Sequence, residues 1–261
     1  PVDGPDYKTT PIHIVQVAMS AGTAYPQAVW RWLDFLSRQS PSQPGKIPAR
    51  RSVAEMAGFW NNLDEETAAT LRFAVNHAIA PSRLMTDWPA AYEALNAELR
   101  AVFNGEKSVT EALAAAQTQA LSGLAAEADR RSAATPVVMT VATVEPPPAA
   151  GATTITFVPL GGDLGIDPFR DAASRFHKSY PGVVVEVRNP DCAGSNVAVL
   201  AGQVDCFQAI PSLDDPKTLS AILNLDPLLE ADPSLSIGDF FPALVDQHRR
   251  AGQTWGLPAA A

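Results

Sequence analysis

The stretch FVPLGGDLGIDPF brings three glycines and two aspartates together between an apolar run and a helical pattern. Gly161, Gly162 and Gly165 could line a turn that binds a phosphate, because glycine-rich turns expose backbone N–H groups. Asp163 and Asp167 could supply oxygen ligands to a metal ion. A polar solute that donates hydrogen bonds to the Asp163 carboxylate is the third kind of ligand that such a turn could hold.

The spacing of these residues argues against a phosphate or a metal. The turn matches neither GxxxxGK[ST] nor the dinucleotide-binding GxGxxG, and an aspartate inside it would repel a phosphate. Asp163 and Asp167 lack the ladder of ligands of a calcium loop, and the four histidines are scattered. We therefore expect no metal and no cofactor. We expect Asp167 to cap the next helix, whereas Asp163 could serve either the turn or a ligand.

Cys192 and Cys206 are the two cysteines of the chain. In an oxidising compartment they could form a disulfide, although a straight helix between them would hold its ends roughly 12 Å apart. Two buried free thiols are the alternative. Nucleophilic catalysis is not expected, because neither cysteine has a histidine nearby in the sequence and no GxSxG pattern occurs.

The aromatic residues fall in three places. Trp88 and Tyr92 begin a predicted helix, where flat rings could face a sugar, but the stripe continues as leucines, which favours core packing. Trp255 stands between two glycines in GQTWGLP, and we expect it at the edge of a crevice. A third group lies in an amphipathic helical pattern and is expected in the core, namely Trp30, Trp32 and Phe35.

The composition limits the classes of function. With 261 residues and 46% hydrophobic content, the chain can build a substantial core. A formal net charge of -9 without a basic cluster argues against nucleic acid or an anionic membrane surface as partner. No apolar stretch approaches the roughly 20 residues that span a bilayer. Twenty-three prolines beside two cysteines suit an extracytoplasmic protein, although these counts do not fix the compartment.

Residues 129–154 lack helical or strand periodicity, contain PPP, and are interpreted as a linker. They separate a largely helical segment, 1–128, from a segment in which strands and helices alternate, 155–261. That alternation predicts an α/β fold whose parallel sheet contains ITFVPL, VVVEV and VDCFQAI. Ligands of such sheets bind beyond the carboxyl ends of the strands, which is where the glycine-rich turn follows the first strand.

The helical segment opens with IHIVQVAMSAG, which predicts a strand that ends at Gly22 and has no neighbouring strand in the sequence. Pro26 is expected at the start of the next helix. Asp64 is expected to cap a later helix, and Ser108 with Glu111 predicts a capping box. None of these helices carries a catalytic spacing.

Together, these stretches resemble the extracellular solute-binding proteins of ATP-binding-cassette importers, of the maltose-binding type. In residues 155–261, ITFVPLGGD, FRDAASRFHKSYPGVVVEV, VDCFQAIPSL and GQTWGLP follow the order of the start of the mature family sequence. In residues 1–128, AMSAGTAYPQAVWRWLDFLSRQ, GKIPARRSV and AVFNGEKSVTEALAAAQTQA resemble its end. Because a family tail precedes a family head, the chain resembles a fragment of a tandem protein, in which one module ends and a second begins.

The resemblance implies a periplasmic-binding-protein-like lobe, with a parallel-rich sheet flanked by helices and a helical tail segment. In the family, the strand that corresponds to IHIVQVAMSAG returns to the first lobe. We therefore expect it to join the sheet of ITFVPL, VVVEV and VDCFQAI. The chain would then form a circularly permuted lobe, or would swap its tail helices onto another copy as a domain-swapped homodimer.

Carried over position by position, the resemblance implies ligand contacts at Gly162, Asp163, Ser212, Asp214, Trp88 and Tyr92. The first two follow the first strand, the next two follow the third strand, and the two aromatic residues come from the other lobe. Pro159 and Leu160 replace more polar or aromatic residues of the family, which leaves the class of solute open.

The expected function is non-covalent capture of a solute, a sugar or oligosaccharide, in a cleft between two lobes that close and dock on a membrane permease. The protein would be extracellular or periplasmic and membrane-tethered in full length. No enzymatic reaction is expected, because the sequence offers no clustered acid/base pair. With half a cleft, the chain itself is expected to bind weakly or not at all. The alternative is an interaction or sensory module whose cleft has lost solute binding.

Overall fold

The computed structural model describes residues 10–12, 14–41, 46–79, 88–132, 151–159, 166–189, 197–209, 213 and 215–260. The contacts between residues divide the chain into two compact units. One unit combines Pro1–Ile79 with Val137–Ala261, and the other is Ala80–Pro136.

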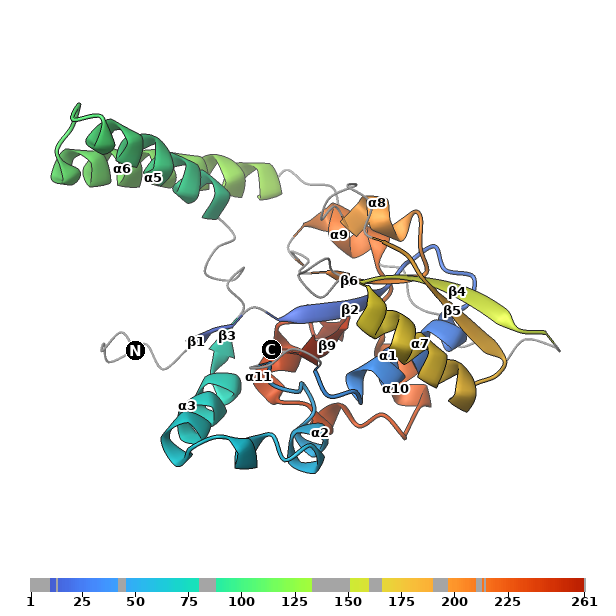
Figure 1. Ribbon diagram of the computed structural model, residues 1–261. Coiled ribbons are helices and arrows are strands. Elements are labelled where there is room, and N and C mark those ends of the chain that lie inside the picture. The colour runs from blue at the N-terminus through green and yellow to red at the C-terminus, as the bar shows by residue number, and fades with distance from the viewer. Residues whose placement is uncertain are drawn as a thin grey trace. The chain divides into compact units, whose positions relative to one another are not determined.

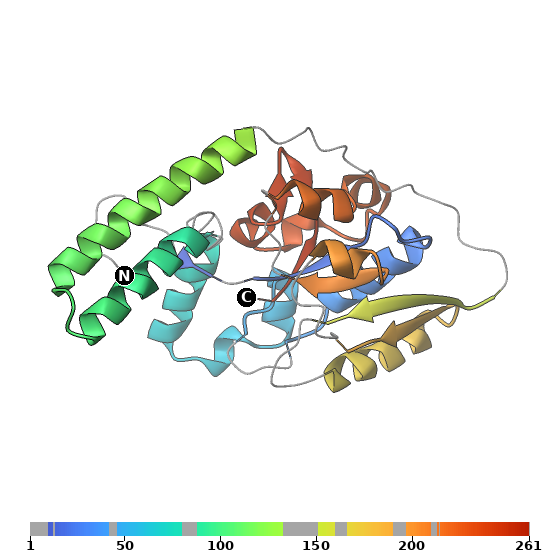
Figure 2. The same cartoon turned by 90° about the horizontal axis from the view of Figure 1, so that it is seen from above.

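The smaller unit is a helical hairpin of α5 (Trp88–Phe103) and α6 (Val109–Ser132), which run side by side in Figures 1 and 2. The predicted capping box is confirmed, because the Glu111 carboxylate accepts from the Ser108 N–H at 2.9 Å and the Glu111 N–H donates to Ser108 Oγ at 3.3 Å. Between the helices, the buried Glu98 carboxylate accepts from Lys107 at 2.6 Å and from Gln119 at 3.0 Å. The hydrogen bonds of the Glu98 side chain therefore join the two helices and the loop between them.

The larger unit is an α/β structure around a sheet of five described strands in the order β5-β4-β6-β2-β9. The strands are β2 (Val15–Met19), β4 (Thr153–Val158), β5 (Val183–Val187), β6 (Cys206–Ala209) and β9 (Leu257–Ala260). β4 is parallel to β5 and β6, as predicted, while β2 is antiparallel to both β6 and β9. The prediction that the strand near the N-terminus joins the later three strands is confirmed.

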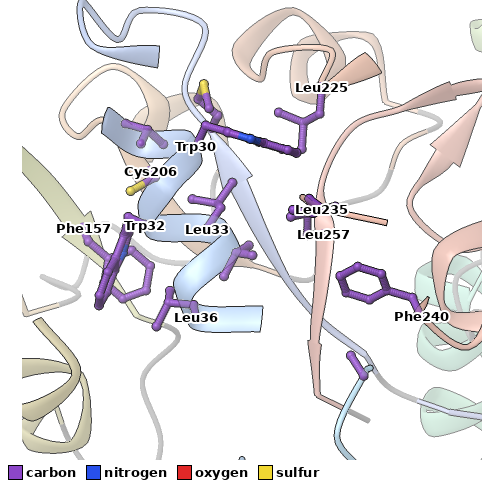
Figure 3. Close-up of a cluster of buried hydrophobic side chains, with 14 of the residues drawn as sticks. Trp30, Trp32, Leu33, Leu36, Phe157, Cys206, Leu225, Leu235, Phe240 and Leu257 are labelled. Atoms are coloured by element: carbon purple, nitrogen blue, oxygen red, sulfur yellow. The ribbon is translucent and has the colours of Figure 1, made fainter. Parts of the chain in front are cut away.

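One face of the sheet is covered by α1 (Pro26–Ser37) and α7 (Asp167–Ser179) (Figure 1). The Trp32 ring meets the edges of Phe157 and Phe176, with ring centroids 5.5 and 5.3 Å apart. Trp30 and Trp32 are buried, as predicted, and lie in the cluster that Figure 3 shows. Pro26 starts α1, also as predicted, because a proline at the first helical positions leaves no internal hydrogen bond unmade.

The opposite face is covered by α8 (Val197–Ala201) and α9 (Pro216–Ala221) (Figure 1). Successive side chains of β2 point to opposite faces, so Val17 and Met19 join the first cluster while Ala18 joins the second. Burial on both faces explains why IHIVQVAM reads as a continuous apolar run rather than an alternating one.

The remaining elements of this unit flank the sheet: β1 (Thr10–Pro11), α2 (Arg51–Met56), the 3-10 turn Trp60–Asn62, α3 (Glu65–Asn76), β3 (Ala78–Ile79), α10 (Asp226–Ala231), the 3-10 turn Ile237–Asp239, α11 (Pro242–Asp246), β7 (Arg249–Arg250) and β8 (Gln253–Thr254). Asp64 caps α3 as predicted, because its carboxylate accepts from the Thr67 N–H at 2.9 Å. The predicted cap at Asp167 is wrong. Asp167 is the first residue of α7, and its carboxylate pairs with Arg170 at 3.1 Å.

A buried ion network lies where α1 meets the start of α2. Arg50 is 2% exposed, and its guanidinium donates to Asp34 at 2.6 Å and to Ser37 Oγ at 2.7 Å. Asp239 lies 3.7 Å away on another side, and the Phe240 ring centroid is 4.6 Å from the guanidinium carbon.

Within the described part of the chain, no helix is long and apolar enough to cross a membrane.

Candidate functional site

The carboxyl ends of β4 and β6 meet at one edge of the sheet. The two strands are parallel, with Phe157 opposite Cys206 and Val158 opposite Phe207. The segments that follow the two strands therefore leave the sheet at the same end. The predicted ligand residues follow these strand ends, at Gly162, Asp163, Ser212 and Asp214. They lie outside the described residues. The structure therefore brings together the strands that lead into the two turns.

The chain returns to described structure on the far side of each turn. After the first turn it enters α7 at Asp167. Before α9, Leu213 is buried in the second apolar cluster, and the Asp215 carboxylate accepts from the N–H groups of Lys217 and Thr218 at 3.2 and 3.1 Å. A buried leucine and a helix cap thus fix the chain immediately beyond this edge of the sheet.

Gln16 is a polar residue at this edge that the sequence analysis missed. It pairs with Ala209, the last residue of β6, and its side chain is fully buried. Its amide nitrogen donates to the Trp255 carbonyl at 3.2 Å, while its amide oxygen has no hydrogen-bond partner among the described residues. A glutamine inside the apolar run IHIVQVAM was the signal that could have identified it.

The close contact with Gln16 explains why position 256, in the GQTWGLP motif, is a glycine. A Cβ at this position would overlap Cγ, Cδ and the amide nitrogen of Gln16, so the Gln16 side chain lies against a backbone that must be bare. The close approach joins β2 to the start of β9. It requires glycine for space and not for a special backbone angle.

We expect Gly256→Ala to lower the free energy of unfolding by about 1–3 kcal/mol, because the fully buried Gln16 side chain would have to move away from the added methyl group. Denaturant unfolding followed by circular dichroism measures the loss. Adding Gln16→Ala should recover part of it, since the overlapping atoms are then absent. Gly182→Ala is the matched control, because a Cβ there meets nothing within 4 Å. Strict additivity of the Gly256 and Gln16 substitutions would contradict the explanation.

Trp255 does not lie at a crevice edge as expected. Its side chain is fully buried in the second apolar cluster, and its indole N–H donates to the Arg250 carbonyl at 3.4 Å. Its backbone N–H donates to the His248 carbonyl at 2.9 Å. Gly252, with φ at 80°, lets the chain reverse between β7 and β8, and this reversal returns the tryptophan to the interior.

The two aromatic residues predicted to face the cleft belong to α5 of the smaller unit. The side chain of Trp88 lies outside the described residues. Tyr92 is 50% exposed, so the core packing that its leucine stripe favoured is not found for this residue. Both belong to the hairpin unit, whereas the strand ends belong to the sheet.

Cys206 carries a free and fully buried thiol, and its predicted disulfide partner Cys192 lies outside the described residues. Burial raises the pKa of the Cys206 thiol well above its ordinary value, and the neighbouring Asp205 carboxylate adds to the effect. The thiol is therefore protonated at neutral pH and is a poor nucleophile.

His248 is a second buried titratable group that the sequence analysis did not single out. Burial lowers the pKa of its imidazole to about 3, and the Nε2 atom has no hydrogen-bond partner among the described residues. The ring is therefore neutral at physiological pH.

Across the described residues, no group of three or more His, Cys, Asp or Glu side chains could hold a metal ion.

No protein-family model, no curated protein and no solved structure matches the chain. The order of the strands and the meeting of β4 and β6 at one edge are therefore the observations on which a function can be argued.

Proposed function

We propose that this chain forms one lobe of an extracytoplasmic solute-binding protein that captures a sugar or oligosaccharide without reaction. The insertion of β2, antiparallel, between β6 and β9 carries the proposal. A strand from the family's end is expected to return to the sheet formed by the family's start, and β2 follows that path. A solute-binding lobe in which a family tail precedes a family head would account for this strand order.

The meeting of the strand ends supports the location of the site. Because Val158 and Phe207 are register partners, the segments with Gly162 and Asp163 and with Ser212 start from neighbouring strands. A carboxylate accepts hydrogen bonds only, and a serine hydroxyl both donates and accepts. Such a pair suits the hydroxyls of a sugar, which also donate and accept.

The partners follow from the same proposal. A second lobe closes the cleft, and the closed protein docks on the permease of an importer at the outer face of a membrane. One lobe makes only part of the ligand contacts. We therefore expect this chain to bind sugars with a dissociation constant on the order of 1 mM or weaker.

The test is a nuclear magnetic resonance titration of the intact chain with a panel of mono- and oligosaccharides. Saturable shifts of the backbone amides of Val158 and Ala209, at the two strand ends, are the expected result. Asp163→Asn should raise the dissociation constant obtained from these shifts about tenfold or more, because an amide N–H₂ replaces an acceptor oxygen. Asp171→Asn, at an exposed position on α7, is the control and should leave the titration unchanged.

Two results would count against the proposal. If no sugar shifts the strand-end amides of the folded chain, capture of a sugar at this edge is wrong, and the alternative of an interaction or sensory module is favoured. If a sugar shifts them equally in wild type and Asp163→Asn, the role of Asp163 is wrong.

A further inference from the structure

The sheet formed by residues 151–260 is open in its centre without β2. β6 and β9 do not pair with each other; each pairs with β2, from opposite sides. β6 meets β2 along Gln16–Met19, and β9 meets it along Val15–Val17. We call the facing edges of β6 and β9 the strand acceptor, and residues 10–79 the donor segment. An exposed pair of strand edges is a template for one added antiparallel strand.

The donor segment also supplies nearly half of the buried side chains of the first apolar cluster. After β2, α1 places Trp32 against Phe157 and Phe176, at 5.5 and 5.3 Å between ring centroids. The Trp30 indole N–H donates to the Asp232 carboxylate at 2.8 Å. The apolar cluster in Figure 3 draws its side chains from both parts of the chain. Neither part could bury these aromatic rings alone.

Polar contacts fix the donor segment in one register. The Asp205 carboxylate accepts from Thr23 Oγ1 at 2.7 Å and from the N–H of Thr156, on β4, at 2.8 Å. At another place, the Asp239 carboxylate accepts from the Ser52 N–H at 3.0 Å. These carboxylates join the donor segment to residues 151–260. Because hydrogen bonds to a carboxylate require a specific geometry, they favour one register of the donor segment.

All these contacts are non-covalent, and the only covalent path between the two parts runs through residues 80–150. We propose that the strand acceptor binds the donor segment as a separable partner, so that a second copy of this chain supplies the segment in trans. In the intact chain the tether gives the chain's own segment an effective concentration of roughly millimolar, so the closed monomer forms first. Once the tether is cut, both sources compete equally.

The test uses the full chain with a site-specific protease sequence inserted between Thr140 and Val141. After folding and cleavage, the two pieces should elute together at the mass of the uncut chain and separate only in denaturant. Isotope-labelled and unlabelled cleaved samples are then mixed, unfolded and refolded together. Native mass spectrometry should find mixed pairs at the statistical proportion.

A pair of variants tests the named contacts. Thr23→Val removes the hydroxyl that donates to Asp205 and should raise the dissociation constant of the cleaved pair about tenfold. Thr70→Val makes the same chemical change at an exposed position of α3 and should leave the dissociation constant unchanged.

The proposal is overturned if the cleaved pieces separate in buffer, or if the refolded mixture contains only pairs of one label. Equal dissociation constants for the cleaved Thr23→Val protein and the cleaved protein with Thr23 unchanged would overturn the register argued from Asp205. No sugar takes part in these measurements, so their failure is distinct from a failure of the proposed function.

Discussion

Asp34→Asn is expected to lower the free energy of unfolding by about 3 kcal/mol or more. Removing one partner from a buried ion pair leaves the other charge without compensation, and such losses are typically about 3–5 kcal/mol. Arg50 is 2% exposed and cannot turn towards water, and Asp239 is a weaker partner at 3.7 Å. Burial lowers the pKa of the Arg50 guanidinium, which Asp34 opposes by its charge. Denaturant unfolding measures the loss.

The reverse substitution separates the ion pair from simple packing. Arg50→Met fills much of the same volume without charge, and Asp34 keeps Arg38, whose Nε donates to it at 2.9 Å. We therefore expect Arg50→Met to cost less than Asp34→Asn, and the double variant to recover most of the loss of Asp34→Asn. A double variant as unstable as the sum of its parts would contradict this account. Asp171→Asn, at an exposed aspartate, should change stability by less than about 0.5 kcal/mol.

The chain is expected to lose roughly 3 kcal/mol of stability between pH 8 and pH 4 through His248 alone. The pKa of His248 is about 3 in the folded protein and 6.5 for an ordinary histidine. Above both values the ring is neutral in both states and has no effect. As the pH falls through 6.5, only the unfolded chain takes up the proton, so stability is lost progressively until about pH 3.

His248→Leu isolates this effect from the titration of other groups. The leucine cannot titrate, so the variant should gain stability relative to wild type as the pH falls, by roughly 3 kcal/mol at pH 4. The comparison at pH 8, where the ring is neutral in both states, gives the change in packing alone. A difference between the two proteins that does not vary with pH would show that the ring titrates in the folded state.

Local patterns in the sequence were sufficient to predict β2, β4, β5 and β6 and several helix starts, but not β9. Pro26, Asp64 and the Ser108–Glu111 box act within one helical turn, so a few neighbouring residues are enough to predict their effects. The resemblance to a binding-protein family added what local patterns lack, namely that the strand near the N-terminus returns to a sheet built much later in the chain. That prediction is confirmed by the pairing of β2 with β6.

Apart from the cap at Asp167, the errors and omissions concern positions that distant residues decide. The burial of Trp255 depends on the reversal at Gly252 and on Gln16, which lies 239 positions away in the sequence. The Arg50 network depends on residues of α1 and of the 3-10 turn near Asp239, and nothing beside Arg50 in the sequence indicates either. At the candidate site, the sequence predicts the turns but gives no geometry for them. The structure adds the meeting of β4 with β6 and the burial of Gln16.

The place of β2 has a consequence for how the chain folds during synthesis. The hydrogen bond from Gln16 to Trp255 spans 239 positions, so this sheet cannot be completed before β9 has left the ribosome. Until β4 and α7 are made, Trp32 lacks the Phe157 and Phe176 rings that cover it, while the α5–α6 hairpin, whose contacts are local, can form. Chains dominated by distant contacts fold slowly and expose apolar surface while they wait. The fold therefore depends on keeping β2 and α1 soluble until β9 has been made.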